Sequence, residues 1–282
     1  MDIEILSEQR CFGGTQGFYR HVSAETGGEM KFGLYLPPLA QGVRAPVLYY
    51  LAGLTCSEET FAIKAGAQRL AAELGLVLVT PDTSPRGTGI EGATGDWEFG
   101  EGAGFYLDAT TPAFASRFRM YGYVTRELPE VIERHFEAAD ALRAGIFGHS
   151  MGGHGALVAA LRNPHRYRSV SAFAPIVAPS QVPWGLKALP RYLGEGRETW
   201  RAYDGCALLA DGARFPGPIL VDQGEADRFL DEQLQPERLE RACRDAGQAL
   251  ELRRRPGYDH SYWFVQSFVG DHLRHHARAL RA

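Results

Sequence analysis

Cysteine is scarce in this chain of 282 residues, and its four cysteines lie far apart. None of Cys11, Cys56, Cys206 and Cys243 belongs to a C-x-x-C pair. This spacing argues against a disulfide framework and against a structural zinc site, because both draw on closely spaced cysteines. Scattered free thiols are typical of a reducing cytosol, so we expect a cytoplasmic protein without a bound metal.

The chain also lacks an excess of positive charge and any long apolar run. Lys and Arg number 30 against 34 Asp and Glu, a formal net charge of −4. Nucleic acids and anionic membranes attract basic surfaces, so neither is an expected partner. No apolar stretch approaches the roughly 18 residues that span a bilayer, and the N-terminal segment has no apolar signal region. We therefore expect a globular protein that acts on a small molecule; the sequence is compatible with a homo-oligomer.

Short apolar runs alternate with longer amphipathic segments from residue 46 onward. Strands are expected at 46–51, 76–80, 144–147, 170–173, 219–222 and 249–253. Helices are expected at 58–74, 125–136, 150–161, 236–246 and 261–280. This alternation predicts an α/β fold, with a mostly parallel sheet covered by helices on both faces and antiparallel hairpins from the first 45 residues at one edge. One domain over residues 1–282 is expected, in which the long unpatterned stretches 82–116 and 175–218 serve function.

The strongest local motif is G-x-S-x-G at residues 148–152, centred on Ser150. An apolar strand precedes it and a helical segment follows it, which is the setting of a nucleophile elbow. The flanking glycines make room for the tight turn, and the first amides of the helix face the oxyanion that forms on the substrate. Ser150 is therefore the predicted nucleophile.

An elbow serine uses an acid and a base that follow it in the order Ser, Asp or Glu, His. Of the nine histidines, His260 alone follows a strand and a turn and precedes a helix, so it is the predicted base. His149 and His154 lie too close to the serine in sequence to turn back onto it. Three further histidines are expected to be solvated on the C-terminal helix: His272, His275 and His276.

Four acidic residues lie at or after the strand expected at 219–222 and could orient this base. They are Asp222, Glu225, Asp227 and Asp231. Asp222 still belongs to the strand, and Asp231 opens the next helical segment. Asp227 lies deepest in the loop and just past a glycine, which favours it, with Glu225 as its rival.

An oxyanion hole needs two backbone N–H donors. One comes from the residue after the nucleophile, Met151. The second comes from the loop at residues 52–56, directly after the strand expected at 46–51, where Gly53 permits close approach of the backbone.

Several longer strings closely resemble the S-formylglutathione hydrolase family, also called esterase D. They are LAGLTCSEETF (51–61), PDTSPRG (81–87), DWEFGEGAGFYLDAT (96–110), RMYGYVTRELP (119–129), GHSMGGHGAL (148–157), PWGLKAL (183–189), DQGEADRFL (222–230) and GYDHSYWF (257–264). The resemblance implies an α/β-hydrolase fold and a triad of Ser150, Asp227 and His260. It also implies an oxyanion hole formed by the amides of Leu54 and Met151, and a reaction without cofactor or metal.

The implied reaction is hydrolysis of S-formylglutathione to glutathione and formate, a step of formaldehyde detoxification. The alternatives are a general carboxylesterase for small esters and an acyltransferase on the same fold. The chain departs from the family at Glu225, where a lysine is common. Cys56, Trp97 and Trp184 are candidate substrate contacts. Four basic side chains are candidates to meet the carboxylates of glutathione: Lys64, Arg86, Lys187 and Arg191.

Overall fold

The computed structural model describes residues 2–281, and in these residues nine strands form one mixed sheet, in the order β1-β2-β3-β5-β4-β6-β7-β8-β9. The strands are β1 (Ile3–Cys11), β2 (Gly14–Ser23), β3 (Gly28–Leu36), β4 (Ala45–Leu51), β5 (Val77–Pro81), β6 (Ala139–His149), β7 (Tyr167–Phe173), β8 (Ile219–Gly224) and β9 (Leu250–Arg255). β1, β2 and β3 pair antiparallel at one edge, and β3 pairs antiparallel with β5. From β5 to β9 all neighbours are parallel, which confirms the expected α/β architecture.

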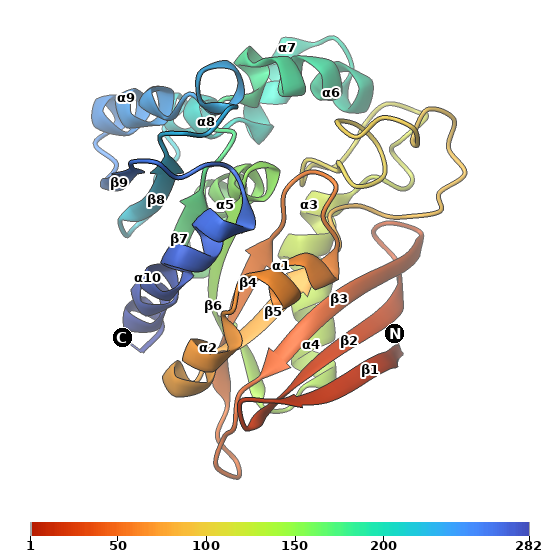
Figure 1. Cartoon of the computed structure of the whole chain (residues 1–282). Coiled ribbons are helices and arrows are strands. Elements are labelled where there is room, and N and C mark those ends of the chain that lie inside the picture. Colours follow the sequence, from red (N-terminus) through yellow and green to blue (C-terminus); the bar gives the residue numbers. More distant parts are fainter. Residues whose placement is uncertain (1, 282) are drawn as a thin grey trace.

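Helices cover both faces of the parallel part of the sheet, so its central strands are almost wholly apolar; every residue of β4 is buried. In Figure 1, α1, α2 and α10 lie in front of the sheet, and α4 and α5 lie behind it. The helices are α1 (Glu58–Lys64), α2 (Gln68–Leu74), α3 (Met120–Gly122), α4 (Leu128–His135), α5 (Met151–Arg162), α6 (Pro183–Leu193), α7 (Arg197–Trp200), α8 (Gly205–Ala210), α9 (Pro236–Ala246) and α10 (Tyr262–Arg281).

Three helical segments differ from the sequence prediction. The helix expected at 58–74 is two helices, α1 and α2, because the chain turns at Gly66 with φ +64°. The helix expected at 125–136 starts earlier, with α3 and a wider π-helical turn (Tyr123–Glu127) before α4. The stretch 175–218, expected to lack regular structure, contains α6, α7 and α8; Pro190 inside α6 interrupts the sequence pattern of a helix without ending it.

The prediction that the histidines of α10 are solvated is wrong. His272 and His276 are fully buried against the sheet, and His275 is half-buried. The hydroxyl of Ser171 on β7 lies 2.8 Å from both His272 Nδ1 and His276 Nε2. Hydrogen bonds of this kind let polar side chains enter the core, and the sequence pattern of α10 did not reveal them.

The parallel strands all point their carboxyl ends to one end of the sheet. In Figure 1 the loop after β5 and the helices α6, α7 and α8 gather at that end, above the ends of β4 and β6. Sites in parallel sheets form at this end, because the loops after the strands meet there. No helix between residues 2 and 281 is long and apolar enough to cross a bilayer.

Candidate active site

Ser150 occupies the turn between β6 and α5 in a strained backbone conformation, with φ 58° and ψ −119°. Its N–H donates to the carbonyl of Phe173 at 2.9 Å, which ties the turn to β7. The flanking glycines are required sterically. A Cβ on Gly148 would lie 2.3 Å from the carbonyl oxygen of Gly152, and one on Gly152 would lie 1.9 Å from that of Leu51. The turn therefore has the geometry of a nucleophile elbow.

His260 and Asp227 come from the loops after β9 and β8 and are joined by a hydrogen bond of 2.5 Å between Nδ1 and Oδ2. The Asp227 carboxylate is fully buried, and its Oδ1 accepts the N–H of Phe229 at 2.9 Å. An acceptor at Nδ1 holds the ring proton there and leaves Nε2 free to accept one. The pair can therefore serve as base and orienting acid.

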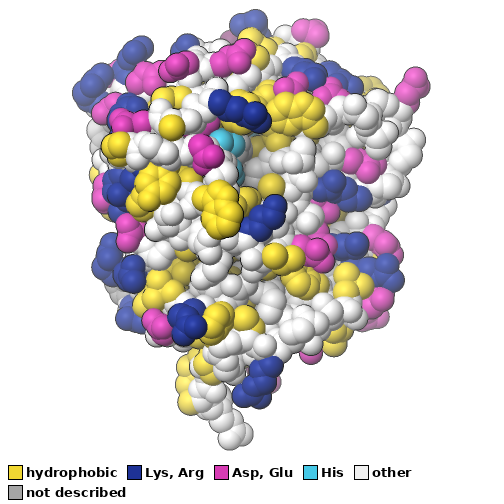
Figure 2. Space-filling view, in the orientation of Figure 1, with side chains coloured by type: hydrophobic (Ala, Val, Ile, Leu, Met, Phe, Trp, Pro, Cys, Tyr) yellow, Lys and Arg dark blue, Asp and Glu magenta, His cyan; other side chains and the backbone are white. Residues whose placement is uncertain are grey.

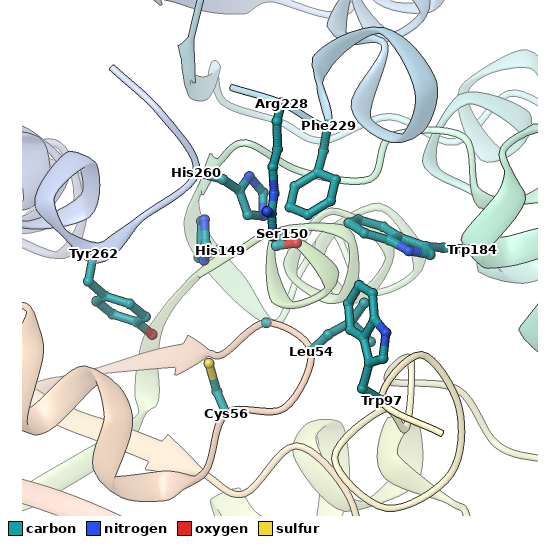
Figure 3. Close-up of a pocket in the computed structure, with 11 residues that line it drawn as sticks. Leu54, Cys56, Trp97, His149, Ser150, Trp184, Arg228, Phe229, His260 and Tyr262 are labelled. Atoms are coloured by element: carbon teal, nitrogen blue, oxygen red, sulfur yellow. The ribbon is translucent and has the colours of Figure 1, made fainter. Parts of the chain in front are cut away.

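Ser150 and His260 line the same cavity, of about 210 Å³ (Figure 3). Within residues 2–281 the Ser150 hydroxyl makes no hydrogen bond, so the contact between serine and base is not closed. Catalytic hydrogen bonds of this type often tighten only when substrate binds. Ser150 and His260 thus meet at one cavity, and the contact between His260 and Asp227 is already formed.

The other candidate acids are directed elsewhere. Burial alone would raise the pKa of Asp222, but hydrogen bonds from His272 and Arg253 outweigh it and lower the pKa to about 2. Asp222 is thereby bound to β9 and α10. The side chains of Glu225 and Asp231 are exposed, and neither forms a hydrogen bond or ion pair with a histidine in the described part of the chain.

The loop after β4 approaches the elbow closely. A Cβ on Gly53 would lie 3.1 Å from Cβ of Ser150, so the neighbouring Leu54 is beside the serine. Thr55 adopts φ +67° and its N–H donates to the carbonyl of Gly102 at 2.9 Å, which fixes the loop.

The amides of Leu54 and Met151 have no acceptor within residues 2–281. Most amides in such a packed region are paired, so two free donors beside one hydroxyl form a suitable place for an oxyanion.

The three candidate substrate contacts all line the cavity. Trp97 and Trp184 pack edge to face, with ring centroids 5.9 Å apart. Trp184 lies in the first turn of α6 rather than in a loop, and its indole N–H donates to Glu98 at 2.9 Å. Cys56 lies on the opposite side of the cavity (Figure 3), where burial raises the pKa of its thiol although hydrogen bonds with Thr60 and Tyr262 partly offset the effect.

Sequence reasoning missed His149 as a site residue. Its ring is buried 4.5 Å from the ring of His260, and neither of its nitrogens has a partner in the described residues. Burial lowers its pKa well below the usual value, and the neighbouring His260 acts in the same direction. The neutral ring of His149 can therefore pack on His260 without adding charge. The sequence signal that could have identified His149 was its position at the end of a strand, directly before Ser150.

Arg228 and Phe229 also line the cavity and were not predicted. Phe229 packs between the rings of Trp184 and His260, with centroids 4.7 and 5.1 Å away. Both residues directly follow Asp227 in sequence, so the prediction of Asp227 as a site residue could have placed them near the cavity as well.

Comparison with known proteins places the chain among esterases. The profile of a family described as "Putative esterase" matches residues 23–275. A Rattus norvegicus protein named S-formylglutathione hydrolase is 49% identical over 286 residues, covering 100% of both chains. The structure of an S-formylglutathione hydrolase from Agrobacterium tumefaciens is 50% identical, with a TM-score of 0.95, and covers 98% of this chain and 99% of its own.

A more distant structure shares the fold. A fluorophosphonate-binding serine hydrolase of Staphylococcus aureus is 16% identical, with a TM-score of 0.74, and the match covers 94% of this chain and 98% of that one. The full-length matches at about half identity go further than fold. The chain belongs to the esterase family, and within it to the S-formylglutathione hydrolases.

Proposed function

We propose that this protein hydrolyses S-formylglutathione to glutathione and formate, with Ser150 as nucleophile, His260 as base and Asp227 as the acid that orients the base. The observation that carries the proposal is the hydrogen bond from His260 to a buried Asp227 at the cavity that also contains Ser150. The names of the two half-identical relatives support the choice of substrate.

The reaction follows from the positions of these groups. The Ser150 oxygen attacks the formyl carbon while its proton passes to Nε2 of His260. The negative oxygen of the tetrahedral intermediate accepts hydrogen bonds from the amides of Leu54 and Met151. Loss of one such donor typically raises the activation free energy by about 3 kcal/mol. Glutathione leaves as a thiol after taking the proton from His260. Water then attacks the formyl ester with His260 again as base; the bond to the Ser150 oxygen breaks, this oxygen takes the proton back from His260, and formate leaves.

The small cavity suits a small acyl group. Its volume of about 210 Å³ is below the roughly 300–1,000 Å³ of pockets that enclose drug-sized ligands. Formyl is the smallest acyl group, but one added methyl group changes the activation free energy by only about 1–3 kcal/mol. Slower hydrolysis of S-acetylglutathione is therefore expected, not complete rejection.

A panel of glutathione thioesters and a short nitrophenyl ester tests the proposal. We expect kcat/KM to be highest for S-formylglutathione, with formate and glutathione released in equal amounts. A higher kcat/KM for the nitrophenyl ester would instead indicate a general carboxylesterase. Formation of a formyl ester from an added alcohol in place of formate would indicate an acyltransferase.

We also propose a cytoplasmic location and a single domain over residues 1–282. Four free cysteines support the location, because reducing compartments preserve thiols. One sheet that takes strands from both halves of the chain supports the single domain.

A further inference from the structure

Three of the four basic side chains expected to meet glutathione are paired with carboxylates of this chain. Lys187 lies 2.8 Å from Asp96. Arg191 lies 3.6 Å from the same carboxylate. Arg86 binds Asp82 at 2.7 Å. These cations hold the loop after β5 in place, and their charges are already compensated.

Arg228 differs from them because it lines the cavity and its charge is uncompensated. Within the described residues it has no ion pair and no hydrogen bond, and its side chain is exposed. Its guanidinium carbon lies 4.6 Å from the centre of the Phe229 ring, which restricts where the group can move. Figure 3 shows the side chain reaching from the loop after β8 toward the region of Ser150 and His260.

The surface around the cavity carries charges of both signs. Figure 2 shows a histidine side chain in a hollow, with Lys or Arg side chains above and below it and an acidic side chain directly beside it. A cavity of about 210 Å³ can receive the acyl group and thioester of S-formylglutathione, but the remainder of the tripeptide must extend over this rim. Glutathione has two carboxylates and one ammonium group, so the part that meets the rim is anionic.

We propose that Arg228 binds a carboxylate of the glutathione portion and so determines specificity for anionic thioesters over neutral esters. This inference rests on the proposed function. A guanidinium presents paired N–H donors that match a carboxylate, and an arginine positioned on an aromatic ring loses little freedom when it binds. The glycine carboxylate is the better match, because fewer bonds separate it from the sulfur than separate the γ-glutamyl carboxylate.

The test compares kcat/KM for S-formylglutathione with kcat/KM for neutral p-nitrophenyl acetate in the same variants. In Arg228→Gln we expect this ratio to fall about tenfold, mainly through a higher KM for the thioester. Arg228→Lys should restore part of the ratio, and Arg228→Glu should lower it further. Arg244→Gln is the matched control, because Arg244 is an exposed arginine of α9 outside the cavity.

Salt gives an independent readout. Added KCl should lower the ratio in the unmodified enzyme, because it screens attraction between exposed charges. The Arg228→Gln variant should lose most of this salt dependence.

Three results would overturn the assignment. The first is an unchanged ratio in Arg228→Gln. The second is an equal loss for both substrates, which would mean that the change disturbs the neighbouring Asp227. The third is a tenfold loss of the ratio in Lys64→Gln with none in Arg228→Gln. Failure of the unmodified enzyme to hydrolyse S-formylglutathione would contradict the proposed function itself, so the two failures are distinguishable.

Discussion

Replacing Asp227 by asparagine tests the proposed triad most directly, because the structure dictates how the new amide must lie. Oδ1 of Asp227 accepts the N–H of Phe229 at 2.9 Å, and Oδ2 faces Nδ1 of His260 at 2.5 Å. In Asp227→Asn the amide oxygen must keep the first position, because an NH₂ group there would oppose another donor. The NH₂ group therefore faces His260 and donates to Nδ1, which moves the ring proton to Nε2.

A histidine with its proton on Nε2 cannot accept the proton of Ser150. In a serine protease the equivalent change of tautomer lowers kcat about 10⁴-fold, which corresponds to about 5.4 kcal/mol of transition-state stabilisation. We expect a loss of this size in Asp227→Asn for both S-formylglutathione and a nitrophenyl ester. The melting temperature should change little, because the amide keeps the hydrogen bond to Phe229 and the same shape.

The matched control is Glu225→Gln, which neutralises an exposed acid in the same loop and should leave kcat/KM within about twofold. The double variant Ser150→Ala/Asp227→Asn should be no slower than Ser150→Ala alone, because triad members act as a unit. Activity of Asp227→Asn within about tenfold of the unmodified enzyme would refute the tautomer argument. A large loss of kcat/KM in Glu225→Gln would show that Glu225, and not Asp227, is the acid that orients His260.

Three further predictions concern the nucleophile, the thiol and a buried histidine. Ser150→Ala should abolish hydrolysis in a folded protein; a rate within about tenfold would contradict the elbow assignment. Cys56→Ser should keep substantial activity and lose sensitivity to bulky alkylating reagents. Inhibition of the unmodified enzyme by these reagents should become faster as pH rises, because burial raises the pKa of the thiol. Equal inhibition of the variant and the unmodified enzyme would refute this prediction. Burial lowers the pKa of His154 to about 4 in the folded protein. As pH falls from above 6.5 toward 4, the unfolded chain therefore takes up a proton at His154 before the folded chain does, and the free energy of unfolding decreases. Urea titrations measure this free energy. Between about pH 7 and about pH 4 it should decrease by about 3 kcal/mol less in His154→Gln than in the unmodified protein. The same pH dependence in both proteins would contradict the lowered pKa of His154.

The sequence predicted the parts of the fold that depend on local pattern. Uninterrupted apolar runs identified the buried parallel strands, although β6 extends well beyond the predicted 144–147 because its first residues include polar ones. The bounds of α9 were predicted correctly, since Gly247 ends the helix in the left-handed conformation. The break between α1 and α2 and the helix α6 with its internal proline were not predicted, because packing outweighs local preference there.

The sequence predicted the geometry of the candidate site where the motif itself creates it, as in the turn at Ser150. It did not predict features that depend on which side chains meet across loops. The charges of Lys187 and Arg191 are neutralised by carboxylates in the loop after β5, nearly a hundred residues away in sequence. Only the assembled loops show that Arg228, not these two, has an unpaired charge at the cavity.

The backbone register of the loop after β8 determines why Asp227, and not Glu225, lies next to His260. Beyond the end of β8, the N–H of Glu225 donates to the carbonyl of Arg255 at 3.0 Å, and the N–H of Ala226 donates to that of Tyr258 at 2.9 Å. These bonds tie the acid's loop to the loop that carries His260 and fix which residue comes next to the imidazole. Glu225 and Ala226 are exposed, and Asp227 is the first residue after β8 whose side chain is buried. The same register directs the next side chain, Arg228, to the cavity, so one short turn places both the carboxylate beside His260 and the guanidinium at the cavity.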